Sequence, residues 1–265
     1  MNLFNYQFTP RLWAVVLYAA LLLCMLWLGN WQLDRAALKV SMAQAAEASR
    51  SAPAVPLAEL DDIETAAQSY ARVSVSGKYD GSRQFLWDNR THKGQAGFEV
   101  LIPLELDDGQ WVLVNRGWTA PGLSRTDLPD VGLPAQTGTA TVDIEGLLSR
   151  PSKGLAGGEA LLEDGSWPRL LQYLDYDAIG RTLGGSVVPA LVQAQTLAED
   201  GSDRTVLTAR PEWLIANWQP SASGPAKHYS YAFQWFAMAV ALSIIFVVVN
   251  TRKPGTRPDQ SKEQT

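Results

Sequence analysis

Histidine is scarce in this chain, and its positions limit the chemistry that the sequence could support. The 265 residues include two histidines, His92 and His228, and a single cysteine, Cys24. A hydrolytic metal site normally uses three protein ligands, often His or Cys, so these residues are too few for one. The sequence also lacks a Gly-x-Ser-x-Gly nucleophile motif and a phosphate-binding glycine loop. We therefore predict that the protein is not an enzyme.

His92 lies in a polar segment, Asp88 to Gly94, between two predicted strands. A Ser-His-Asp arrangement could be drawn with Asp88, but no other motif supports one. A solvated loop histidine is therefore the favoured interpretation. A membrane-anchored hydrolase is the distant alternative, and it would lose its activity on substitution of His92 by alanine.

His228 stands at the start of an apolar stretch with no charged residue between Lys227 and Arg252. At about 1.5 Å per residue, about 20 such residues cross the hydrocarbon core of a membrane. We therefore predict a transmembrane helix over residues 228–250. The aromatic residues at its beginning are those that a membrane–water interface prefers.

A second apolar run, near the N-terminus, predicts a transmembrane helix over residues 11–33. Charged residues separate this run from the nearest small-residue cleavage pattern, so an uncleaved anchor is favoured over a signal peptide. The two spans leave residues 34–226 as one domain and residues 251–265 as a tail. Basic residues in the tail predict that both termini lie in the cytoplasm or its topological equivalent and that the central domain lies on the opposite side of the membrane. Our interpretation is a bacterial inner membrane with a periplasmic central domain.

A histidine at the end of a membrane-spanning helix is uncommon and usually has a specific role. Two interpretations of His228 stay open. In the first, it bonds a backbone carbonyl or water at the interface. In the second, it is an axial ligand to haem iron, a standard role of neutral imidazole. Tyr231 and Trp235 follow on the same predicted helical face and could pack on a flat macrocycle. Arg35, near Trp31 at the end of the first helix, could bind the haem propionates.

Between the spans, the pattern changes to period-two alternation, which is typical of strands. Turn signals such as Asp80-Gly81 separate the alternating segments. Many short strands with turns at near-regular spacing predict a β-rich domain, either an antiparallel barrel or a sandwich. A helix is predicted from Asp175, as N-cap, to Leu183. The formal net charge of −5 argues against nucleic acid as a partner.

One predicted strand ends in Asn115-Arg116-Gly117-Trp118. A plain strand exit is one interpretation, and Gly117 suits it. The alternative is an edge at which Arg116 and Trp118 contact the membrane or a partner protein, because Trp and Arg are common interface anchors. The sequence does not decide between the two.

Five short motifs occur in order along the chain. They are Leu28-Gly29-x-Trp31-Gln32-x-x-Arg35; Gly77-x-Tyr79-Asp80 with Asp88-Asn89-Arg90; Gly97-Phe98-x-Val100 with Pro103-Leu104; Val112 to Trp118; and His228-x-x-Tyr231-Ala232-x-Gln234-Trp235-Phe236. In these motifs, and in having two spans around a large central domain, the chain resembles the Surfeit-locus-one family of cytochrome c oxidase assembly proteins. The resemblance covers essentially the whole chain, although residues 149–205 match weakly.

The resemblance implies a role in maturing the catalytic subunit of a haem–copper oxidase, with haem a as cofactor and haem a synthase as a further candidate partner. It implies His228 as the ligand of the haem iron, in a pocket shaped by Trp31, Arg35, Tyr231 and Trp235. It also leaves a rival, a membrane scaffold that stabilises an assembly intermediate and binds no cofactor. In that case His228 would donate a hydrogen bond between the two helices.

Overall fold

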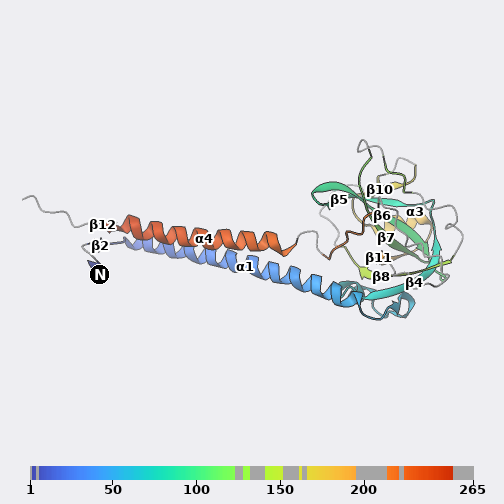
Figure 1. Cartoon of the computed structure of the whole chain (residues 1–265), viewed down its shortest axis with the longest axis horizontal. Helices are drawn as coiled ribbons and strands as arrows, with labels where there is room; N and C mark the ends of the chain where they lie inside the picture. The colour runs from blue at the N-terminus through green and yellow to red at the C-terminus, as the bar shows by residue number, and fades with distance from the viewer. Residues whose placement is uncertain are drawn as a thin grey trace, which may run out of the picture. The chain divides into compact units, whose positions relative to one another are not determined.

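The computed structural model describes residues 2–3, 6–122, 128–131, 141–151, 161–162, 166–194, 214–220 and 224–252. The chain divides into two compact units (Figure 1). The helical unit comprises Met1–Met42 and Ser221–Thr265, and the β domain comprises Ala43–Pro220.

The helical unit is built on two long apolar helices, α1 (Leu12–Arg50) and α4 (Pro225–Asn250). With 39 residues, α1 is about 58 Å long, roughly twice the thickness of a membrane's hydrocarbon core. Its last turns belong to the β domain. The shorter α4 begins with Pro225 in its first turn, where the missing backbone N–H of proline costs nothing. Both helices are long and apolar enough to cross a membrane.

The two helices lie side by side along a continuous contact line, which we call the seam (Figure 1). Poorly exposed residues of each helix recur at intervals of three or four, the spacing of helices that pack with knobs-into-holes contacts. On α1 these seam residues are Ala14, Tyr18, Leu22, Met25, Gly29, Gln32 and Ala36. On α4 they are Pro225, His228, Ala232, Trp235, Ala239, Leu242 and Phe246.

Contacts along the seam show that the helices run antiparallel. Near the start of α1, the Tyr18 hydroxyl shares a hydrogen bond of 2.9 Å with Ser243, and its ring stacks on Phe246 with centroids 4.2 Å apart. Farther along, Gly29 lies so close to Phe236 that an added Cβ would stand 2.6 Å from the ring. A small residue is therefore required at Gly29 for this helix spacing.

A small sheet joins the chain ends of the helical unit. It has the order β1 (Asn2–Leu3), β2 (Tyr6–Phe8), β12 (Thr251–Arg252). β12 follows α4 directly and pairs antiparallel with β2, which precedes α1. The segments flanking the two helices are therefore tied to each other at the end opposite to His228.

The β domain is a nine-stranded mixed sheet in the order β3-β4-β8-β11-β7-β6-β5-β10-β9. An additional pairing of β4 with β6 closes five of these strands into a ring. The ring strands are β4 (Arg72–Tyr79), β6 (Gln95–Glu105), β7 (Trp111–Thr119), β8 (Thr141–Ser149) and β11 (Val187–Ala194). The remaining elements are β3 (Val55–Pro56), η1 (Leu57–Glu59), α2 (Ile63–Gln68), β5 (Phe85–His92), β9 (Leu161–Leu162), β10 (Arg169–Leu171) and α3 (Tyr176–Leu183).

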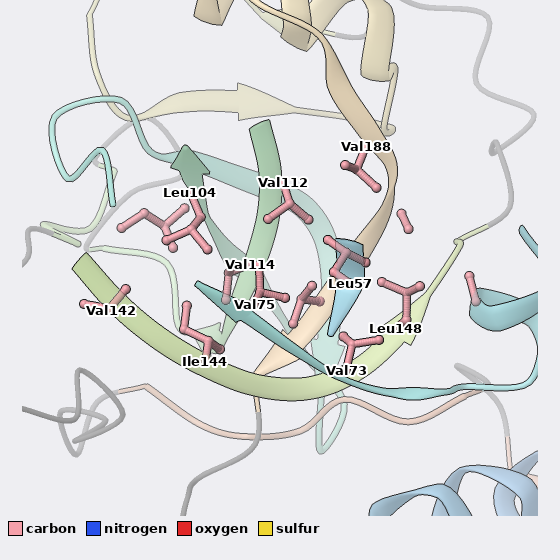
Figure 2. Close-up of a cluster of buried hydrophobic side chains, with 14 of the residues drawn as sticks. Leu57, Val73, Val75, Leu104, Val112, Val114, Val142, Ile144, Leu148 and Val188 are labelled. Atoms are coloured by element: carbon pink, nitrogen blue, oxygen red, sulfur yellow. The ribbon is translucent and has the colours of Figure 1, made fainter. Parts of the chain in front are cut away.

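The main core of the β domain lies on one face of this ring. Alternate residues of the ring strands point to the same side and are buried together (Figure 2). They include Val73, Val75, Ile102, Leu104, Val112, Val114, Val142, Ile144, Ala190 and Val192. A second cluster packs α3 against β5, β6 and β7, with Phe85 and Ile179 fully buried. Successive residues of β6 and β7 contribute to different clusters, so these two strands are buried on both faces.

The predicted β-rich domain and the two apolar helices are confirmed, and so are the caps of α3. Asp175 accepts a hydrogen bond of 3.0 Å from the backbone N–H of Ala178, and Gly184 ends the helix in the left-handed conformation. The predicted antiparallel arrangement holds for most strand pairs but not for all, because β11 pairs parallel to β7, β10 to β5 and β3 to β4. The sequence also predicts a short strand over residues 205–208, which lie outside the described residues.

The sequence prediction also ended one strand too early. β5 continues through the polar segment to His92 and forms a hairpin with β6. The turn is made by Lys93 and Gly94, both with positive φ. A register shift in β5 between Trp87 and Arg90 accompanies Asn89, which also has a positive φ. Such a bulge interrupts the alternation, which explains why the pattern did not predict this half of the strand.

Candidate functional site

The seam of the helical unit brings one imidazole against one carboxamide. His228 lies in the first turn of α4, and Gln32 lies on the seam of α1. The Nδ1 atom of His228 and the Oε1 atom of Gln32 are 2.8 Å apart and share a hydrogen bond. The side chains are partly buried. This bond leaves Nε2, the second ring nitrogen, as the one that could ligate a metal ion or haem iron.

The residues around His228 are small or aromatic. Ala232, one turn further along α4, is 2% exposed, and it adds almost no volume to the seam beside the imidazole. Trp235 also lies on the seam and is half-buried. Tyr231, in contrast, is 42% exposed and lies on the outer surface of α4. The structure therefore places Trp235, but not Tyr231, on the face of the helix that carries His228.

Trp31 and Arg35 form a separate pair on the exposed side of α1. The guanidinium carbon of Arg35 lies 5.7 Å from the centre of the Trp31 ring, within range of a cation–π interaction. Trp31 is 42% exposed and Arg35 is exposed. An exposed guanidinium that rests on an aromatic ring can bind an anionic group such as a carboxylate. The structure does not bring this pair into hydrogen-bonding contact with His228.

The five predicted site residues thus divide by exposure. His228 and Trp235 lie on the seam, whereas Trp31, Arg35 and Tyr231 are exposed beside it. This donor set fits a haem at the edge of the helix pair. It offers one imidazole nitrogen for the iron, aromatic surface for the macrocycle and a cation for the propionates. It does not fit a haem inserted between His228 and Gln32, because these side chains are in direct contact.

Gln32 is the residue that sequence reasoning did not assign to the site. It belongs to the polar face at the end of the first span, and its position there was visible in the sequence. Its partner was not, because the separation of 196 residues between Gln32 and His228 gives no periodic signal. The antiparallel register of α1 and α4 determines which residues are in contact. This register cannot be predicted from the periodicity of a single sequence.

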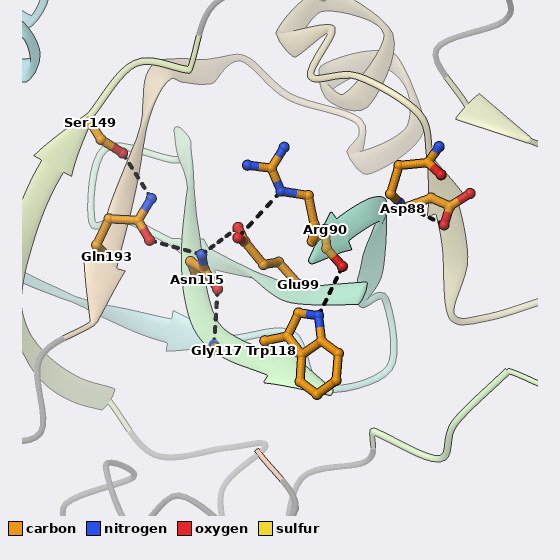
Figure 3. Close-up of polar contacts among 9 residues, drawn as sticks. Asp88, Arg90, Glu99, Asn115, Gly117, Trp118, Ser149 and Gln193 are labelled. Carbon is orange, nitrogen blue, oxygen red and sulfur yellow. Dashed lines mark hydrogen bonds and ion pairs between the residues drawn. The ribbon is translucent and has the colours of Figure 1, made fainter. Parts of the chain in front are cut away.

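In the β domain, the Asn115 to Trp118 segment has a structural role. The Asn115 side chain donates to Glu99 at 2.9 Å and to Gln193 at 2.8 Å, and it accepts from the backbone N–H of Gly117. Gln193 in turn donates to Ser149. Figure 3 shows this chain of contacts, which connects β6, β7, β11 and β8.

Arg116 and Trp118, the predicted partner contacts, are both buried. Arg116 is 9% exposed and donates to Gln84 and to the carbonyl of Val131. Trp118 is 3% exposed, and its indole N–H donates to the carbonyl of Arg90 at 2.9 Å (Figure 3). Each side chain therefore stabilises the domain from within. Their role as partner contacts stays a prediction that these positions do not favour.

Within this network, the surroundings of the Glu99 carboxyl group shift its pKa. Burial raises the pKa of Glu99 above its ordinary value, although the nearby charge of Arg90 and hydrogen bonds from Arg90 and Asn115 lower it. Arg90 forms an ion pair with Glu99 at 3.3 Å and also lies 3.9 Å over the Trp87 ring. The carboxyl is thus buried and enclosed by its partners, which indicates a structural group.

The chain matches a known protein family over most of its length. The family model of the SURF1 family matches residues 19–240, which includes most of both long helices and the whole β domain. Uncharacterized SURF1-like proteins of Mycobacterium tuberculosis and Mycobacterium bovis are 34% identical over 155 residues. That alignment covers 57% of this chain and 56% of the relative, so the chain spans little more than half the length of these relatives.

Longer alignments extend the similarity at lower identity. A SURF1-like protein of Rickettsia felis is 23% identical over 224 residues, which cover 83% of this chain and 89% of the relative. The resemblance drawn from the five sequence motifs is confirmed. The chain belongs to the SURF1 family, which is known for the assembly of cytochrome oxidase.

Proposed function

We propose that this protein is a membrane-bound assembly factor for a haem–copper terminal oxidase and that it acts on the catalytic subunit. The observation that carries the proposal is membership of the SURF1 family over residues 19–240. The scarcity of histidine and cysteine is consistent with a protein that holds or delivers a cofactor and catalyses no reaction. Haem a synthase, as the source of the cofactor, is a second candidate partner.

We further propose that α1 and α4 span a membrane. Only 6% of the most apolar window of α1 and 11% of that of α4 are buried within the protein. In water, this amount of exposed apolar helix surface would be strongly unfavourable, whereas lipid solvates it. The residues after α4 support a cytoplasmic location of the tail in a bacterial inner membrane, with the β domain on the periplasmic side.

Haem a is the cofactor that we propose for the outer end of the helix pair. His228 supplies the iron ligand through Nε2, and Trp235 and Tyr231 supply aromatic surface for the macrocycle. Arg35, with Trp31 beneath it, supplies a cation for a propionate. Bound haem contributes its own iron chemistry, and the chain's residues bind it, orient it and limit its contact with water.

A cofactor-free scaffold is the second candidate, and one observation favours it. The hydrogen bond between His228 and Gln32 is the interhelical contact that a scaffold would use to hold the two helices together. In such a protein the whole role of His228 is to support the helix pair. The two candidates differ in whether Nε2 ever binds iron.

Purification of the full chain in mild detergent, from cells that make haem a, distinguishes them. The carrier predicts a Soret band with haem a features that disappears in His228→Ala. Tyr18→Phe is the matched control, because it also removes an interhelical hydrogen bond but leaves His228 in place. Copurification of the oxidase catalytic subunit without a Soret band in the wild-type protein would establish the scaffold.

A further inference from the structure

We propose that Gln32 is a positioning residue that fixes the tautomer of His228, so that the proton is on Nδ1 and the lone pair of Nε2 is presented for metal ligation. The haem-directed part of this inference rests on the proposed function. The tautomer itself does not, and it can be measured in the protein without a cofactor.

The argument begins with the two atoms in contact. A carboxamide oxygen only accepts hydrogen bonds, and neutral imidazole carries its proton on one of its two nitrogens. A bond of 2.8 Å between Oε1 of Gln32 and Nδ1 of His228 therefore requires the proton on Nδ1. In water, histidine favours the opposite tautomer, with the proton on Nε2. The contact with Gln32 thus reverses the intrinsic preference of the ring.

This arrangement is the one that metal-ligating histidines use. Such a histidine almost always donates its other ring N–H to a fixed acceptor, which sets the tautomer, orients the ring and raises its basicity. Here the acceptor comes from α1 and the imidazole from α4, so the ring is oriented only when the helices are packed. Loss of the acceptor typically weakens metal affinity about 10- to 100-fold.

A merely structural role for the Gln32–His228 bond makes a different prediction. The seam has a second interhelical bond, between Tyr18 and Ser243, about 21 Å away from Gln32 along α1. If the Gln32–His228 bond only held the helices together, loss of either bond would affect the unit in the same way. If Gln32 is a positioning residue, substitution of Gln32 changes the tautomer of His228, and substitution of Tyr18 does not.

The test is nitrogen NMR of the full chain in detergent with ¹⁵N-labelled histidine, at alkaline pH, where imidazole is neutral. The chain has two histidines, so a His92→Gln background leaves the signals of His228 alone. We expect a protonated Nδ1 and an unprotonated Nε2. Gln32→Leu should shift the ring toward the Nε2–H tautomer. Gln32→Glu keeps an acceptor oxygen and should retain Nδ1–H, and Tyr18→Phe should change nothing.

Two NMR results would overturn the tautomer assignment. One is an Nε2–H tautomer in the wild-type chain, and the other is an unchanged tautomer in Gln32→Leu. In haem titrations, Gln32→Leu should bind about 10- to 100-fold more weakly, whereas Gln32→Glu should bind haem with a more negative reduction potential, because its carboxylate makes the imidazole more basic. Equal haem affinity in Gln32→Leu and wild type would refute the positioning role.

Failure of the proposed function is distinguishable from failure of this inference. If the wild-type chain shows the Nδ1–H tautomer, lost in Gln32→Leu, yet takes up no haem, then the haem assignment fails and the tautomer assignment stands. If the wild-type chain takes up haem through His228 but carries the proton on Nε2 before loading, the haem assignment stands and the role of Gln32 fails.

Discussion

The buried polar groups of the β domain and the partly buried polar groups on the seam differ in how many hydrogen-bond partners they have. In the β domain, Glu99, Asn115, Gln193 and Ser149 form one chain of hydrogen bonds in which each side chain has partners on neighbouring strands. On the seam, within the described part of the chain, His228 has a hydrogen bond at Nδ1, to Gln32, and none at Nε2. The network in the β domain holds neighbouring strands together. The Gln32–His228 bond orients the imidazole of His228 and leaves its Nε2 atom outside the bond.

The apolar surfaces of the two units differ in the same sense. Among the described residues of the β domain, Val55 is the one large apolar side chain that is clearly exposed. Within the helical unit, many are exposed, including Trp13, Leu23, Phe233 and Val249, each at least 63%. The described part of the β domain therefore exposes few large apolar side chains, whereas the helical unit exposes many, which favours contact with lipid or with another protein. Substitutions in the two units should accordingly have separable effects.

The largest effect is expected in the core of the β domain. Phe85 is fully buried against Trp167 and α3, so Phe85→Ala leaves a cavity and should cost about 3–5 kcal/mol of unfolding free energy. Denaturant titration of the full chain, followed by tryptophan fluorescence, measures it. Phe85→Leu, which retains most of the volume, should cost less. A loss below about 1 kcal/mol for alanine would show that this core is not tightly packed.

The polar network comes next. Asn115→Ala removes the amide that bridges Glu99 and Gln193 and should leave buried groups unpaired, each at about 1–3 kcal/mol. The same denaturant titration applies. Ser149→Ala, at the end of the network, removes fewer bonds and should cost less. Equal costs for the two variants would mean that Asn115 is not the centre of the network.

A third substitution probes the seam. Gly29→Leu places a side chain where Phe236 lies 2.6 Å from the position of an added Cβ, and such overpacking typically costs about 1–3 kcal/mol. Because Gln32 is on the next turn of the same helix, the Nδ1–H signal of His228 should be lost. Phe236→Ala in the same chain makes room and should restore the signal. Failure of this rescue would contradict the close helix packing.

The smallest effect concerns pH. Because the pKa of Glu99 is raised in the folded state, the folded protein holds this proton more tightly than the unfolded chain does. Stability should therefore fall as pH rises from the ordinary carboxyl pKa through the raised one, by about 1.4 kcal/mol for each pKa unit of elevation. Glu99→Gln should show a flatter profile over this window in denaturant titrations. An unchanged profile would show that Glu99 is not the titrating group.

The sequence predicted the elements better than it predicted their contacts. Local sequence patterns predicted the apolar helices, the alternating strands and the caps of α3. The parallel pairing of β11 with β7 depends on contacts far apart in sequence, and so does the hydrogen bond of Gln32 with His228. The Arg116 and Trp118 side chains show the same limit. Residue types common in interfaces are here used inside the domain.

The central claim is that the outer end of the seam binds haem a through His228, and one measurement tests it most directly. It is the visible spectrum of the full chain, purified from cells that make haem a, recorded beside that of His228→Ala. We predict a Soret band with haem a features in the wild-type chain and none in the variant. A wild-type chain without the band, despite a supply of haem a, would contradict the claim, and so would a band of equal strength in His228→Ala.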